Sequence, residues 1–107
     1  PVLTLEQDPS YAVANLEPVG FMARLQDKFG NPLNGSVEFS AGSKAKPGSG
    51  TFTMTPDKTN FKLGNAYSEL RTDTAGVSWV RAKATMGDKT LEKVLTVWVV
   101  ENHQPNS

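Results

Sequence analysis

Apolar residues in this chain alternate with polar residues over short runs, and this alternation limits the possible folds more than any other feature. Successive side chains of a β-strand point to opposite faces, so a period of two indicates strands with one buried face. The clearest run extends from Val19 to Leu25, where Val19, Phe21, Ala23 and Leu25 share one face. Helical periodicity is hard to find in the sequence. The pattern therefore predicts an all-β fold.

Clusters of Gly, Pro, Asn and Asp separate the alternating runs, and the chain contains nine Gly and seven Pro. We expect about seven strands at a spacing of roughly ten residues, which is typical of an immunoglobulin-like sandwich of two sheets. A small barrel is the alternative architecture. The expected strands fall within residues 2–5, 19–26, 37–41, 51–55, 67–71, 77–85 and 90–100.

The inward positions of these strands define one predicted core. Its members are Leu5, Val19, Phe21, Ala23, Leu25, Val37, Phe39, Phe52, Leu70, Val80, Leu95 and Val97. Segments 27–35, 42–50 and 56–64 are rich in turn residues and are predicted to be connections. In the last of these, we expect Phe61 and Leu63 to hold the loop against the edge of the core.

The last two strands are predicted to form a hairpin, because Gly87-Asp88 lies between two runs rich in β-formers. Symmetry about this turn pairs Lys83 with Glu92 on the outer face, which is a favourable charge pair. A shift of one residue would turn Arg81 and Lys83 towards the core, at a much higher cost than exposing an indole. The charge pattern therefore predicts one register for the hairpin.

This register places both tryptophans on the outer face. Trp79 lies opposite Thr96, and Trp98 becomes its diagonal neighbour, within reach of it. Val94 and Val100 extend the apolar patch, so Trp79, Trp98 and Val94 form a candidate partner-contact surface. Either loop residues such as Phe61 or Tyr67, or an adjacent domain, cover this patch. Otherwise it binds a receptor protein or a glycan, since exposed tryptophan is enriched at binding hot spots.

Size and composition exclude several classes of protein. The chain has 107 residues and a mass of 11.6 kDa, which fits one domain. Eleven basic residues balance eleven acidic ones, and this neutrality argues against a dedicated nucleic-acid-binding module. The absence of cysteine excludes disulfides, thiolate nucleophiles and Cys-ligated zinc. No apolar run approaches the ~18 residues of a membrane span.

Few residues offer catalytic or metal-binding chemistry. The single histidine, His103, lies in the polar segment 101–107, where we expect it to be solvated and not held for catalysis. Lys93 falls on the inward face and is a candidate for an isopeptide bond, but a lysine at a sheet edge more often extends its ammonium group to solvent. Five further residues carry side-chain oxygens in predicted loops, where turn capping accounts for them better than calcium binding: Asp27, Asn31, Asp57, Asn60 and Asp73. The sequence therefore predicts no enzyme, no cofactor and no metal.

Two stretches carry a resemblance to a known family. The first runs from Leu25 to Phe39 and contains Asp27-Lys28-Phe29-Gly30-Asn31-Pro32, and the second is Leu70-Arg71-Thr72-Asp73-Thr74-Ala75-Gly76-Val77. Both resemble the bacterial immunoglobulin-like domains of the invasin/intimin type, known as Big-1 domains. The first stretch has one residue fewer before Val37 than the family pattern. Segment 42–64 matches no part of that pattern.

The resemblance implies a function as well as a fold. Domains of this family are usually repeated in tandem as extracellular stalks of Gram-negative adhesins, and they carry no catalytic residues. It implies a stalk, spacer or adhesion unit of an outer-membrane-anchored protein at the bacterial surface. The expected partners are neighbouring immunoglobulin-like domains, with a host receptor protein or glycan as a further candidate, and neither nucleic acid nor direct membrane insertion is expected. A carbohydrate-binding module and a phage-virion accessory domain are the alternatives.

The expected domain organisation is simple. Residues 1–100 are predicted to form the immunoglobulin-like domain, and residues 101–107 a polar tail or linker. The chain opens with Pro1-Val2-Leu3-Thr4, without the basic and apolar segments of a signal peptide. We therefore expect it to be a segment of a longer protein.

Overall fold

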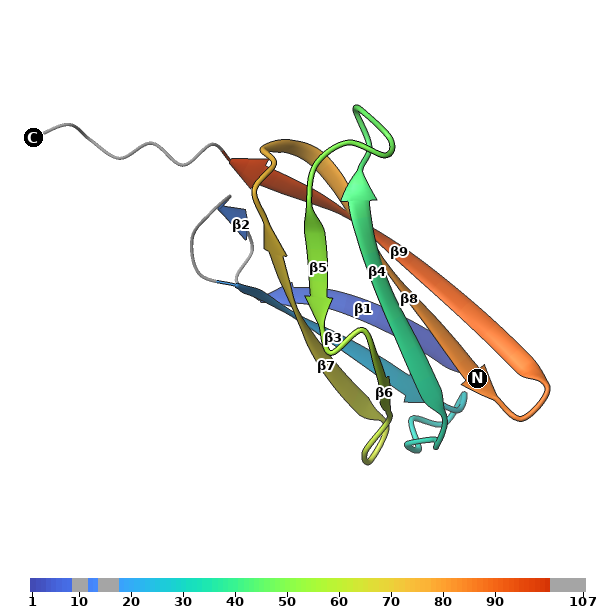
Figure 1. Cartoon of the computed structure of the whole chain (residues 1–107). Coiled ribbons are helices and arrows are strands. Elements are labelled where there is room, and N and C mark those ends of the chain that lie inside the picture. Colours follow the sequence, from blue (N-terminus) through green and yellow to red (C-terminus); the bar gives the residue numbers. More distant parts are fainter. Residues whose placement is uncertain (9–11, 14–17, 101–107) are drawn as a thin grey trace, which may run out of the picture.

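The structure, a computed structural model, describes residues 1–8, 12–13 and 18–100, which form nine strands in two facing sheets (Figure 1). The four-stranded sheet has the order β1 (Val2–Asp8), β3 (Val19–Gln26), β7 (Asn65–Thr72) and β5 (Phe52–Thr55). The five-stranded sheet has the order β2 (Ala12–Val13), β9 (Lys89–Val100), β8 (Gly76–Met86), β4 (Ser36–Ser43) and β6 (Lys58–Asn60). All pairs are antiparallel except β2 with β9. The predicted immunoglobulin-like sandwich is confirmed.

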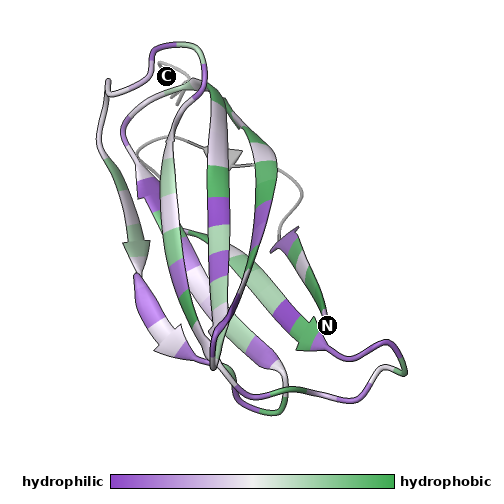
Figure 2. Ribbon diagram, turned by 90° about the vertical axis from the view of Figure 1, so that its right-hand side faces the viewer, coloured by the Kyte–Doolittle hydropathy of each residue, from purple (hydrophilic) through white to green (hydrophobic). Residues whose placement is uncertain are grey.

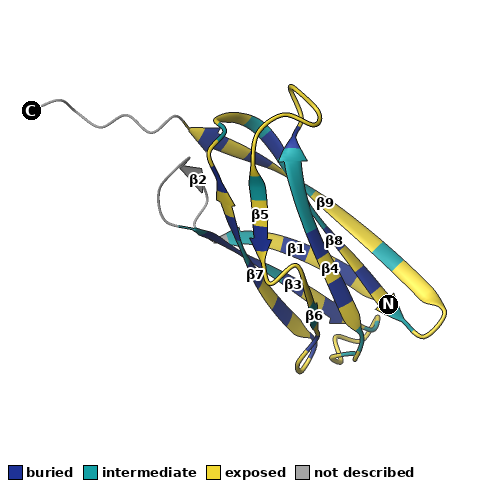
Figure 3. Ribbon diagram, viewed as in Figure 1, coloured by how far each residue is buried: buried dark blue, intermediate teal, exposed yellow. Residues whose placement is uncertain are grey.

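One core fills the space between the two sheets. Exposed and buried residues alternate along β3, β7 and β8, as the banding in Figure 3 shows. All predicted core residues are buried except Phe52 and Leu95, which are partly buried and pack against the core. The core also includes Leu3, Met54, Phe61, Ala66, Ala82, Ala84 and Val99. Figure 2 shows the same alternation as bands of high and low hydropathy along the strands.

The hairpin of β8 and β9 has the predicted register. Lys83 pairs with Glu92, and Trp79 pairs with Thr96. Gly87 has a φ of 58°, a left-handed conformation that glycine adopts without steric cost. A positive φ at the first of two turn residues is typical of a type II′ turn, whose twist matches that of the two strands.

The predicted connections differ from the structure at three places. Segment 56–64 contains the short strand β6, which pairs with β4 through only three residues and is too short to show an alternating pattern. Phe61 is buried as predicted, but the prediction for Leu63 is wrong, since this side chain is 85% exposed in a tight turn. Gly42 and Ser43 belong to β4 and not to a loop, because β4 stays paired with β8 as far as Ser43.

The two ends of the described chain lie at opposite ends of the sandwich (Figure 1). In that view β1 begins at the lower end, close to the N label, whereas β9 ends at the upper end. The molecule is elongated, with principal extents of 52 × 27 × 20 Å. The chain therefore enters the domain at one end and leaves it at the other. The predicted tail, residues 101–107, and His103 within it lie outside the described residues.

Candidate functional site

The outer face of the five-stranded sheet carries side chains in rows that cross β4, β8 and β9. The register defines these rows, because residues that pair across antiparallel strands point to the same face. Three rows near the upper end form what we call the tryptophan surface. They consist of Lys44, Val77 and Trp98, then Gly42, Trp79 and Thr96, then Ser40, Arg81 and Val94.

The two indoles differ in their surroundings. Trp98 is 65% exposed, and Val94, two rows farther down β9, is 54% exposed. Trp79 is partly buried and its ring lies against Gly42, where an added Cβ would come within 2.8 Å of the ring carbon Cζ2. The missing side chain of Gly42 therefore provides the space that the Trp79 indole occupies.

The structure tests the idea that loop residues cover this patch. Phe61 is buried in the core, and Tyr67 belongs to β7 in the opposite sheet. Neither residue lies over the tryptophans, so the interpretation that Phe61 or Tyr67 covers them is wrong. Trp79, Trp98 and Val94 lie on one outer face, as the hairpin register predicted. Their role in contacting a partner stays a prediction.

Two cations lie among the indoles. The Arg81 guanidinium carbon is 5.6 Å from the centroid of the Trp79 ring, and Arg81 Nε donates a hydrogen bond of 3.3 Å to Ser40 Oγ. Lys44 Nζ donates a hydrogen bond of 2.9 Å to Thr96 Oγ1, in the row next to Trp98. Hydrogen bonds and the cation–π contact hold both cations in defined positions.

Farther down the same face, acidic residues lie beside basic ones. The next row consists of Glu38, Lys83 and Glu92, and Lys58 Nζ lies 3.5 Å from Glu38 Oε2. Positive and negative charges are therefore mixed below the tryptophan surface. The three rows of that surface contain two cations and no carboxylate. Among the described residues, the upper half of this face is thus positively charged, although the whole chain is neutral.

The hairpin register predicted from the sequence placed both tryptophans and Arg81 on the outer face, but it did not include Lys44. Lys44 was assigned to a loop, whereas its backbone N–H donates to the Val77 carbonyl at 2.9 Å and continues the β4–β8 pairing by one residue. The alternation Glu38, Ser40, Gly42, Lys44 was the available signal, because it extends the outer-facing positions of β4.

A shallow depression borders the tryptophan surface at the edge of β4. Its volume is about 280 Å³, and Trp79 forms one wall. Segment 47–50 and Phe52 also line it. The glycines and serines that line it leave backbone groups accessible. The depression therefore offers polar contacts beside an indole.

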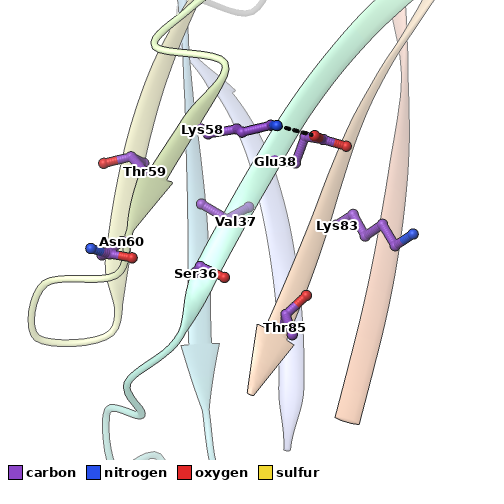
Figure 4. Close-up of a pocket in the computed structure, with 8 residues that line it drawn as sticks. All are labelled: Ser36, Val37, Glu38, Lys58, Thr59, Asn60, Lys83 and Thr85. Atoms are coloured by element: carbon purple, nitrogen blue, oxygen red, sulfur yellow. Dashed lines mark ion pairs between the residues drawn. The ribbon is translucent and has the colours of Figure 1, made fainter. Parts of the chain in front are cut away.

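A second open depression, of about 500 Å³, lies at the lower end of the same sheet (Figure 4). Its charged residues are Glu38, Lys58 and Lys83, and the remaining lining includes the hydroxyl groups of Ser36, Thr59 and Thr85. Glu38 is already paired with Lys58, as Figure 4 shows. This lining offers neither a paired carboxylate nor a nucleophile with an adjacent base.

The candidate oxygen donors have structural partners. Asp27 Oδ1 accepts the backbone N–H groups of Phe29 and Asn31 at 2.8 and 2.9 Å, and Asp27 Oδ2 accepts Asn31 Nδ2 at 3.0 Å. Asp73 Oδ1 accepts the Thr74 hydroxyl at 2.7 Å and the Thr51 N–H at 3.0 Å. These hydrogen bonds lower the pKa of both carboxyls, chiefly through the side chains of Asn31 and Thr74 respectively. Both aspartates stabilise turns, as predicted.

The remaining candidate residues for metal binding or cross-linking do not come together into a site. Across the described ranges, no group of three or more His, Cys, Asp or Glu residues is arranged to hold a metal ion. Lys93, the candidate for an isopeptide bond, is exposed. Asp57 directly precedes β6, and its carbonyl accepts the Phe39 N–H at 2.7 Å. Asn60 is the last residue of β6 and pairs with Ser36, so it lies in a strand and not in the predicted loop. Within the described residues there is also no helix with the length and hydropathy needed to span a membrane.

Comparison with known proteins identifies the fold. No family model matches this chain, and no curated protein matches it. The D0-D1 domain of intimin is similar over 94% of this chain and 50% of its own, with 24% identity and a TM-score of 0.69. The D00-D0 domain of intimin is similar over 88% and 45%, with 23% identity and a TM-score of 0.63. The E. coli chaperone DraB is similar over 91% and 54%, with 11% identity and a TM-score of 0.63.

The chain thus spans about half the length of each of these structures. Intimin and a chaperone share its architecture, so these likenesses establish the fold and leave the role to be argued from the surface. The two sequence stretches that resembled the invasin/intimin type predicted this fold correctly. The chain is an immunoglobulin-like sandwich with the architecture of the intimin domains.

Proposed function

We propose that this chain is a non-catalytic, immunoglobulin-like module of a larger bacterial surface adhesin, in which it acts as a stalk or spacer unit. The observation that carries the proposal is the position of the two chain ends, which lie at opposite ends of a sandwich 52 Å long (Figure 1). Consecutive domains of this shape extend a chain outward, because each one begins where the previous one ends. Neighbouring domains of the same protein are the partners this role requires.

Two further observations support the proposal. The similar intimin structures are about twice as long as this chain, which is the size expected if this chain corresponds to one unit of a series. The depression of about 500 Å³ at the lower end of the described surface offers a salt bridge and hydroxyl groups and no arrangement of catalytic groups. A spacer needs a stable fold and no such arrangement.

Small-angle X-ray scattering on this domain together with its natural neighbours tests the proposal. The full reading frame of the parent gene supplies the neighbouring sequences, and the isolated domain is the control. We expect each similar domain to lengthen the maximum dimension of the particle by close to 52 Å, the length of the sandwich. A particle whose domains fold back on one another, or a parent gene without similar neighbours, would contradict the stalk role.

A further inference from the structure

We propose that the tryptophan surface binds a saccharide that carries a carboxylate group. This inference goes beyond the stalk role and does not depend on it. It rests on the alternation of indoles and cations across three rows: Arg81, Trp79, Lys44 and Trp98. The occupant must therefore combine a weakly polar face with negative charge, and an acidic sugar has both features.

Trp98 provides the stacking platform. Its indole is 65% exposed at the upper end of β9, with Val77 beside it in the same row. The C–H groups on one face of a sugar ring are weakly positive, and they pack favourably on the negative face of an indole. The hairpin already fixes the Trp98 backbone, so binding has only the side-chain torsions of the indole to immobilise.

Arg81 and Lys44 provide the charge. Arg81 uses Nε to bind Ser40 and stacks near Trp79, which leaves its terminal N–H groups to form a fork for a carboxylate. Lys44 donates a hydrogen bond to Thr96, which shares a row with Trp79, and Lys44 itself shares a row with Trp98. The three rows contain no carboxylate to neutralise these cations. The surface is therefore complementary to an anion as well as to a ring.

The depression beside Trp79 accommodates the rest of the chain of sugars. The depression has a volume of about 280 Å³, and the indole of Trp79 and segment 47–50 line it. Hydroxyl and backbone groups there match the hydroxyl groups of a sugar unit next to the one on Trp98. Binding would thus extend from Trp98 across Trp79 to the edge of β4.

An acidic saccharide fits this surface better than nucleic acid. A single strand of nucleic acid needs a continuous positive groove along its phosphates. The cations here are confined to two rows, and the next row down contains Glu38 and Glu92.

Nuclear magnetic resonance titration of the 107-residue chain tests the proposal. The probe is tetragalacturonate, the neutral comparison is maltotetraose, and an oligothymidylate of eight nucleotides represents nucleic acid. The two tryptophans give separate indole N–H signals, so each reports on its own site. We expect tetragalacturonate to shift both signals, with binding that weakens as salt increases, and maltotetraose to bind at least about tenfold more weakly.

Matched variants separate stacking from charge. Trp98→Ala is expected to weaken tetragalacturonate binding by about tenfold or more, and its melting temperature should stay near wild type because the indole is exposed. Phe29→Ala is the control, since Phe29 is 77% exposed with Lys28 Nζ 5.1 Å from its ring centroid, but lies in another segment. Arg81→Gln is expected to weaken binding and reduce its salt dependence. Lys83→Gln removes a cation two residues away on the same face and should change neither.

Several results would overturn the proposal. Equal binding of maltotetraose and tetragalacturonate would exclude recognition of the carboxylate. Indole signals that do not move, or equal losses in Arg81→Gln and Lys83→Gln, would exclude this surface. Tighter binding of the oligothymidylate would assign the surface to nucleic acid. The scattering experiment on neighbouring domains is independent, so a stalk unit that fails to bind the saccharide would still give extended particles.

Discussion

The backbone and the side chain are mismatched at Leu63. Lys62 and Asn65 exchange backbone hydrogen bonds of 2.8 and 3.0 Å, so Leu63 and Gly64 are the two central residues of a tight turn. Their φ angles are 52° and 78°, as in a type I′ turn. Leucine is poorly suited to this conformation, and its side chain is 85% exposed. The sequence contains an apolar residue here for which the fold provides no apolar contact surface.

We therefore expect Leu63→Asn to stabilise the domain. Asparagine tolerates the left-handed conformation, whose cost for other L-residues is roughly 1–2 kcal/mol, and little burial is lost. A gain of about 1 kcal/mol in the free energy of unfolding is expected, measured by urea denaturation. Leu63→Ala is the control, because it removes the same apolar side chain but lacks the local hydrogen bonding that lets asparagine tolerate a positive φ. Equal gains in both variants would show that exposure of the leucine, and not its φ angle, limits stability.

The connection between β3 and β4 is closed by hydrogen bonds to one carboxylate. Asp27 accepts two backbone N–H groups and the Asn31 side chain, and these bonds lower its pKa below the ordinary 3.8. The folded form therefore holds this proton less strongly than the unfolded form does. The resulting stabilisation is complete well above pH 3.8, and it is lost as the pH falls through 3.8 towards the lower pKa of the folded state.

Asn31→Ala tests this coupling, because the Asn31 side chain is the largest cause of the lowered pKa. We expect the variant to have a lower melting temperature than wild type at pH 6, and a smaller fall in melting temperature between pH 6 and pH 3. Asn34→Ala, a change of the same kind in the same connection, is the control and should leave the fall unchanged. An unchanged fall in Asn31→Ala would show that the Asn31 side chain does not couple Asp27 to acid sensitivity.

The strands of this fold could be predicted from the sequence where they pair with a strand adjacent in the chain. The β8–β9 hairpin could be predicted residue by residue, because the short turn at Gly87 leaves one register that keeps Arg81 and Lys83 out of the core. Strand β6 has three residues and β2 has two, so neither is long enough to show a period of two. Leu63 was wrongly placed at the core because hydropathy does not report the φ angle that the turn imposes.

At the scale of the whole molecule, pairing between distant segments decides what the surface contains. The tryptophans were predictable because β8 and β9 are adjacent in sequence. Lys44 joins them only because β4 pairs with β8, from which it is separated by two strands of the other sheet and by β6. No local pattern specifies that pairing. The candidate site was therefore predictable in part: its two indoles and Arg81 follow from the hairpin register, and Lys44 follows from the sheet order.

The shared core also predicts how the molecule unfolds. Both tryptophans belong to the five-stranded sheet, so their fluorescence reports on that sheet, whereas far-ultraviolet circular dichroism reports on both sheets. Leu70 lies in β7 of the four-stranded sheet and is 2% exposed. Leu70→Val removes one methylene from the core, which costs about 1 kcal/mol and lowers the melting temperature by about 4 °C in a domain of this size.

Because one core joins the two sheets, the fluorescence and circular dichroism transitions of Leu70→Val should shift together. Arg71→Lys, on the exposed side of the same strand, should shift neither. A Leu70→Val variant whose fluorescence transition stays at the wild-type temperature would show that the two sheets unfold separately.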